Sequence, residues 1–173
     1  MSPWIDCNRR LIEMSSKMLR WSLGIAALLA IACLIALTSP ASLQANSDPW
    51  TKTQTVRPAD LAKELGDSKT APTVVFVGFK RLYSAGHIKG AEYPGTAGSE
   101  EGLKELTVWA TGLPRTTNLV IYCGCCPLER CPNIRPAYTA LHDMGFTHVR
   151  VLVLPTSFAA DWVEKGYPME KGR

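Results

Sequence analysis

Cysteine is missing from most of the chain. None occurs between Cys33 and Cys123, and none follows Cys131. Disulfide bonds that staple a small fold join cysteines spread along the sequence, so this distribution excludes a disulfide framework. The cysteines of the folded part must therefore act together, in one place.

The chain also lacks a strongly charged segment. Its formal net charge of +4 is mild, and the basic residues after position 46 are scattered without interleaved aromatic residues. A nucleic-acid-binding surface needs a clustered basic footprint, so we expect no nucleic-acid partner. The chain has no internal repeat, and its 46% hydrophobic and 20% charged residues are typical of a globular domain.

The N-terminal residues 1–45 predict export. Basic residues up to Arg20 precede an uncharged apolar run at 21–38. This length lies between a signal-peptide core of about 7–15 residues and a spanning helix of about 17–25, so both a cleaved signal peptide and a retained membrane anchor stay open. The basic flank places the folded part on the extracytoplasmic face of the membrane, as in a periplasm. Residues 46–55 are expected to be a linker, and residues 56–171 the domain.

Strand and helix patterns alternate after the linker. Buried-strand patterns occupy 73–79, 116–123 and 147–155, with a short extended piece at 91–95. Helical patterns occupy 57–66, 99–112, 133–146 and 157–168, with Ser99 and Ser157 as expected caps. This alternation predicts an α/β fold, a parallel sheet with helices on both faces.

The stretch VIYCGCCPLERCPNIRP holds four cysteines within nine residues: Cys123, Cys125, Cys126 and Cys131. It joins the strand at 116–123 to the helix at 133–146, and ligands of open parallel sheets bind at such strand ends. Loop amides and a helix N-terminus lower the pKa of a thiol. We therefore expect Cys123 to be the most reactive thiol and Cys131 the second, with Arg130 and Arg135 adding positive charge.

Three segments carry a pattern of their own. Residues 82–95 read LYSAGHIKGAEYPG, residues 119–123 read LVIYC, and residues 140–170 combine a Gly-Phe pair, a strand and a Gly-Tyr-Pro end. In this order they resemble rhodanese domains, and the resemblance covers roughly residues 56–171. It implies the rhodanese-like fold and a sulfurtransferase that needs no cofactor. Cys123 would carry sulfur as a persulfide, received from a small sulfur donor and passed to a thiol acceptor.

The resemblance has departures near the expected site. Phe76 and Gly78 stand where rhodaneses usually carry an aspartate and an arginine, and Leu128 stands where the active-site loop usually has an arginine. The loop itself is longer and richer in cysteine. His87, in the Gly-His-Ile segment, is expected to be structural.

Two other functions remain open for the cysteine loop. Cys123 and Cys126 form a Cys-x-x-Cys pair, the spacing of dithiol redox modules. All four cysteines together predict, as an alternative, a copper or zinc site, with Cu(I) favoured because it accepts two or three thiolates. In either case Cys125, Cys126 and Cys131 are candidate second thiols.

Overall fold

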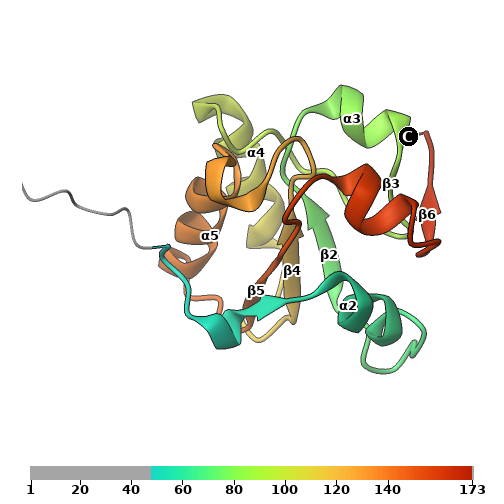
Figure 1. The fold of residues 1–173 in the computed structure, drawn as a ribbon. Helices are drawn as coiled ribbons and strands as arrows, with labels where there is room; N and C mark the ends of the chain where they lie inside the picture. Colours follow the sequence, from blue (N-terminus) through green and yellow to red (C-terminus); the bar gives the residue numbers. More distant parts are fainter. Residues whose placement is uncertain (1–47, 173) are drawn as a thin grey trace, which may run out of the picture. The chain divides into compact units, whose positions relative to one another are not determined.

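The computed structural model describes residues 48–172, which belong to one compact unit (Figure 1). The predictions for the signal peptide or membrane anchor fall on residues 1–45, outside the described residues. Within residues 48–172, no helix is long and apolar enough to cross a membrane.

A four-stranded parallel sheet forms the centre, in the order β1-β5-β4-β2. Its strands are β1 (Thr55–Val56), β2 (Thr73–Phe76), β4 (Leu119–Tyr122) and β5 (Val149–Leu152). Every residue of β4 is buried, because β4 lies between β5 and β2 and is covered on both faces. The continuous apolar sequence LVIY is typical of such a strand. The residues that follow β4 therefore lie near the middle of the sheet, at the end formed by the carboxyl ends of its strands.

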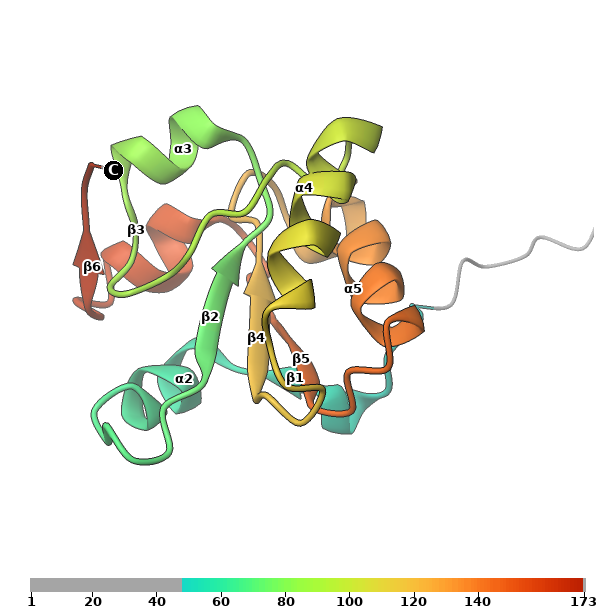
Figure 2. The ribbon, with the colours of Figure 1, turned by 180° about the vertical axis from the view of Figure 1, so that it is seen from behind.

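Helices cover both faces of the sheet (Figures 1 and 2). α4 (Glu100–Thr111) and α5 (Ile134–Asp143) lie on one face, whereas α2 (Pro58–Glu64) and α3 (Lys80–Ala85) lie on the other. Alternation along β4 divides the core. Ile121 packs with the α4 and α5 side, and Tyr122 packs with the α2 and α3 side. The predicted α/β arrangement with two covered faces is confirmed.

Short elements complete the fold. They are η1 (Lys52–Gln54), η2 (Leu128–Arg130), the π-helical turn η3 (Ala159–Val163), and an antiparallel pair formed by β3 (His87–Ile88) and β6 (Met169–Glu170). His87 is fully buried. Its Nδ1 lies 2.8 Å from the carbonyl oxygen of Tyr83 and its Nε2 lies 3.1 Å from Glu170. The structural role predicted for His87 is therefore confirmed.

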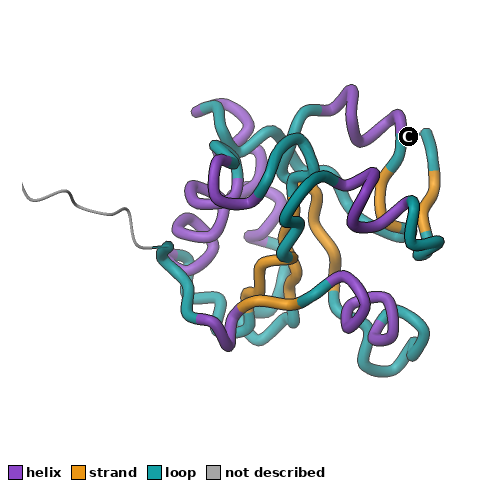
Figure 3. The backbone as a smooth tube through the Cα atoms, viewed as in Figure 1, coloured by secondary structure: helices purple, strands orange, loops and turns teal. Residues whose placement is uncertain are grey.

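The last predicted helix is wrong in extent. Instead of 157–168, only η3 forms, although the Ser157 hydroxyl does accept a hydrogen bond from the Ala160 amide at 3.2 Å. The cap of α4 is as predicted, since the Ser99 hydroxyl accepts from the Gly102 amide at 3.2 Å. β2 and β4 each continue as a loop at their carboxyl ends, which lie at the same end of the sheet (Figure 3). The cysteines lie in the loop after β4.

Candidate functional site

Cys123 directly follows β4, and its position is fixed by the sheet. The alternation that places Leu119 and Ile121 on the α4 and α5 face also places Cys123 there. The residue is 3% exposed. A residue held by a central strand in this way has little freedom to move, which suits a group that must meet a substrate in one geometry.

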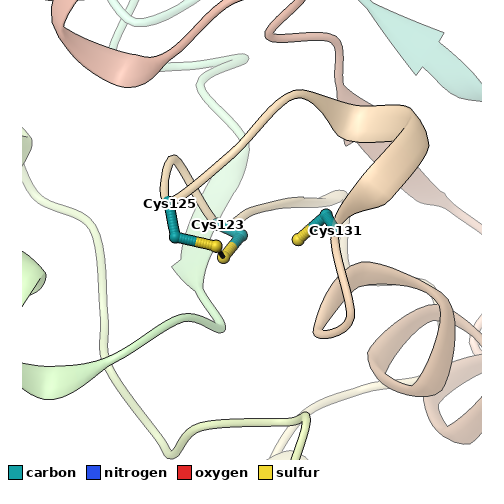
Figure 4. Close-up of side chains that lie close together, drawn as sticks. All are labelled: Cys123, Cys125 and Cys131. Carbon is teal, nitrogen blue, oxygen red and sulfur yellow. Dashed lines mark hydrogen bonds between the residues drawn. The ribbon is translucent and has the colours of Figure 1, made fainter.

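Three cysteine sulfurs converge at this point. Those of Cys123, Cys125 and Cys131 all lie within 4.8 Å of one another, and the Cys123 and Cys125 sulfurs are 3.0 Å apart. Figure 4 shows the Cys131 sulfur pointing toward the other two from the far end of the loop. The Cys126 sulfur contacts Cys125 at 3.2 Å but is not part of this trio. All four cysteines are free thiols.

Asn133 is a member of the site that sequence reasoning missed. Its side-chain Nδ2 group donates a hydrogen bond to the Cys123 sulfur at 3.1 Å. Its side-chain oxygen Oδ1 accepts a hydrogen bond from the backbone N–H of Gly98 at 2.8 Å. The residue is 1% exposed and immediately precedes α5. Asparagine at a helix start normally caps the helix, but this side chain makes no cap bond. In the sequence, the feature that could have indicated Asn133 as a site residue is its position directly after the cysteine loop.

The Cys123 and Cys131 thiols shift each other's pKa in opposite directions. The Cys131 pKa is lowered to about 5 by a hydrogen bond from the Cys123 thiol and by the backbone N–H groups of Asn133 and Ile134 at the start of α5. The Cys123 pKa is raised by the same hydrogen bond and by burial. Burial also raises the Cys126 pKa to about 12. The pair therefore favours a thiolate on Cys131, beside the helix N-terminus.

The two arginines predicted for the site have different surroundings. Arg130 is exposed at the end of η2. The Arg135 guanidinium pairs with Asp48 at 2.5 Å, lies over the Trp50 ring, and donates to the Cys131 carbonyl oxygen at 3.4 Å. Among the described residues, neither guanidinium has a hydrogen bond to a cysteine sulfur. Their role in stabilising sulfur stays a prediction.

Gly78, in the loop after β2, lies close to the Cys123 sulfur and to the ring of Phe76, the last residue of β2. A Cβ atom added to Gly78 would lie 2.8 Å from the Cys123 sulfur and 2.8 Å from the Phe76 ring. Such separations are too short for real side chains, so the close approach of the β2 end to Cys123 requires glycine. Phe76 and Gly78, which stand where rhodaneses usually carry an aspartate and an arginine, therefore bring no charge to the neighbourhood of Cys123.

A cavity of about 420 Å³ opens beside Cys123. Cys123 and Gly124 form part of its wall, Phe76 and Phe158 contribute aromatic rings, and Lys171 contributes a cation. Cys125, Cys126 and Cys131 do not line it. Cys123 is therefore the one cysteine of the loop that borders this cavity.

The trio also has the donor set of a soft-metal site. Three thiolates within 4.8 Å of one another suit Cu(I) or, with a fourth ligand, Zn²⁺. The predicted redox pair is Cys123 and Cys126. The sulfur of Cys125 contacts the sulfurs of both residues, at 3.0 Å and 3.2 Å.

Solved structures with the same fold are rhodanese-like domains. The rhodanese-like domain of the Alr3790 protein from Anabaena sp. is 23% identical, with a TM-score of 0.51 over 68% of this chain and 79% of that chain. Thiosulfate sulfurtransferase from Pseudomonas aeruginosa is 23% identical, with a TM-score of 0.51 over 73% of this chain and 20% of that one. A persulfide form of EanB with ergothioneine is 21% identical, with a TM-score of 0.53 over 68% and 28%.

No protein-family model matches the chain, and a search of curated proteins finds no match. The structural similarities confirm the expected fold, a rhodanese-like α/β domain with a parallel central sheet.

Proposed function

We propose that this domain is a sulfurtransferase that carries sulfane sulfur as a persulfide on Cys123. The observation that supports the proposal most is the placement of this thiol. It directly follows the central strand of a rhodanese-like sheet, borders a cavity, and accepts a hydrogen bond from Asn133 at 3.1 Å. A cysteine with a fixed backbone, an anion-stabilising donor and a position at the wall of a cavity has what a covalent sulfur carrier needs.

The chemistry divides into two displacements. In the first, the Cys123 thiolate attacks the outer sulfur of a donor, a new S–S bond forms, and the donor leaves with the electron pair of the broken bond. In the second, the thiolate of a small acceptor attacks the outer sulfur of the persulfide and releases Cys123. Cys131 lies close enough to take the proton that the Cys123 thiol must lose before the first attack.

The solved structures support this proposal at the level of the fold. One is a thiosulfate sulfurtransferase and another is an enzyme captured with a persulfide. Each is less than 25% identical to this chain, so the activity rests on the site's own geometry.

The test is sulfur transfer with thiosulfate or an organic persulfide as donor and dithiothreitol as acceptor. Intact mass should show the addition of one sulfur atom after donor is added, and dithiothreitol should remove it. Cys123→Ser should abolish both the adduct and turnover while circular dichroism stays that of the wild type. Unchanged turnover in a folded Cys123→Ser protein would contradict the assignment, and a loss of two hydrogen atoms instead of a sulfur adduct would favour redox chemistry.

A second candidate function is favoured by the sulfur trio. We propose Cu(I) binding by Cys123, Cys125 and Cys131 as the alternative, because their sulfurs converge and Cys126 stands outside the group. Cu(I) titration of the anaerobic protein should then give one equivalent bound, lost in Cys131→Ser and retained in Cys126→Ser. Equal loss in both variants, or no binding by the wild type, would contradict a three-thiolate site.

A further inference from the structure

The cavity beside Cys123 is walled mainly by apolar side chains. They come from segments far apart in the sequence: Phe76 ends β2, Leu82 lies in α3, Phe158 and Val163 belong to the η3 segment, and Met169 begins β6. A volume of about 420 Å³ falls within the range of small-molecule sites. A small inorganic donor such as thiosulfate would leave most of this apolar wall uncovered.

The cavity lining also carries little charge that could stabilise a small inorganic anion. Among the described residues that line the cavity, Lys171 is the one basic side chain, and no acidic or guanidinium group is present. A dianion in this space would be desolvated against hydrocarbon with one exposed ammonium group as its partner, which is costly. A singly charged molecule with an apolar group avoids that cost.

The loop after β4 packs against Phe158, the residue before η3, and so borders the cavity beside Cys123. Gly124 has φ of +76°, and a Cβ there would lie 2.8 Å from the Cβ of Phe158. The loop backbone therefore rests directly on Phe158, one of the apolar walls. A donor whose outer sulfur meets Cys123 must place the rest of its body among these side chains.

We infer that the cavity selects sulfane-sulfur donors that carry an apolar organic group, such as organic thiosulfonates, over small inorganic or methyl-sized donors. The inference rests on the proposed function and adds its substrate class. Phe158 and Val163 are the residues that set this preference, since both line the cavity and Val163 is also 39% exposed.

For a thiosulfonate the reaction balances without another reagent. The Cys123 thiolate forms a bond to the outer sulfur, and the bond between that sulfur and the sulfonyl sulfur breaks. The electron pair leaves with the organic sulfinate, so two negative charges stand on each side of the equation. The apolar group stays in the cavity until the sulfinate dissociates.

The experiment compares two donors with the same reacting group, methanethiosulfonate and benzenethiosulfonate. The kcat/KM of the full chain is measured for each with dithiothreitol as acceptor. Each value is divided by the rate at which the donor reacts with dithiothreitol alone, which removes the difference in intrinsic reactivity. We expect benzenethiosulfonate to be preferred by at least about tenfold, the discrimination that an apolar pocket gives for added hydrocarbon.

Two valine variants locate the preference. Val163→Asp places a carboxylate at the cavity and should reduce the preference to less than about threefold, mainly through the benzene compound. Val108→Asp is the matched control, because Val108 is 62% exposed on α4 and does not line the cavity. Equal normalised kcat/KM for the two donors, or a preference that Val163→Asp leaves intact, would overturn the inference.

A second measurement separates this inference from the proposed function. If neither donor forms a persulfide, the proposed function fails, and calorimetry with the sulfinates still tests the cavity. Benzenesulfinate should then bind the wild type at least about tenfold more tightly than methanesulfinate, and Val163→Asp should remove the difference. Equal binding of the two sulfinates would overturn the inference in that case as well.

Discussion

At the scale of single residues, Asn133 contributes a hydrogen bond that favours negative charge on the Cys123 sulfur. Its amide N–H group faces the Cys123 sulfur, and its carbonyl oxygen is anchored by the Gly98 amide, so the donor cannot turn away. The backbone N–H groups at the start of α5 act on Cys131 in the same sense. Together they favour the thiolate form of the Cys123 and Cys131 pair.

The pH dependence of thiol alkylation tests this arrangement. Because the Cys131 pKa is lowered to about 5, the pair should lose its first proton near that pH, well below the usual thiol value of about 8.5. Asn133→Leu removes the donor to Cys123 and should move the midpoint up by at least about one unit, which slows alkylation roughly tenfold near pH 4, below both midpoints, and roughly twofold near pH 6. Iodoacetamide labelling between pH 4 and pH 9, read by peptide mass spectrometry, measures both the midpoint and the order in which Cys123 and Cys131 react.

Asn118→Leu is the control for that substitution. Asn118 precedes β4 at the opposite end of the strand, where its side chain accepts from Arg150 at 3.3 Å. Its replacement should leave the alkylation profile unchanged. A profile that Asn133→Leu does not shift would mean that the amide positions the loop without stabilising the thiolate.

At the scale of helices and strands, the sequence predicted the elements that are long and periodic. The strand at 73–79, the helix at 99–112 and the helix at 133–146 are present as β2, α4 and α5 with shorter bounds. Each carries enough buried positions to leave a period in the sequence. Pro136 lies in the first turn of α5, where its missing N–H removes no hydrogen bond, as the prediction required.

The short elements could not be predicted in the same way. β3 and β6 have two residues each and pair across more than eighty positions, so their pairing depends on contacts that no local pattern encodes. α3 has six residues and its register is set by Tyr83, which packs into the core. The same limit applies to the site. The cysteines were visible in the sequence, but the donor from Asn133 and the glycine contact at Gly78 arise where separate segments meet.

At the scale of the whole domain, the segment before α2 is part of the core on the α5 side. Trp50 is 9% exposed, and its ring meets Tyr138 edge-on at 5.4 Å between centroids. Arg135 lies over the same ring and pairs with Asp48. Thr55 and Val56 add β1 to the sheet edge. Residues 48–55, expected as a linker, thus contact α5 and the sheet.

This packing predicts that Trp50→Ala will destabilise the domain by about 3 kcal/mol, the lower end of the range for deleting a buried aromatic ring, because Trp50 lies at the margin of its cluster. Urea unfolding followed by circular dichroism measures the loss. Phe79→Ala is the matched control, since that ring is 52% exposed, and it should change stability by less than about 0.5 kcal/mol. If Trp50→Ala costs no more than Phe79→Ala, the segment at 48–56 rests on the domain without contributing to its core. A loss of the expected size would instead place the start of the stable domain before Trp50, and Arg135 would owe its orientation beside the Cys131 carbonyl to this segment.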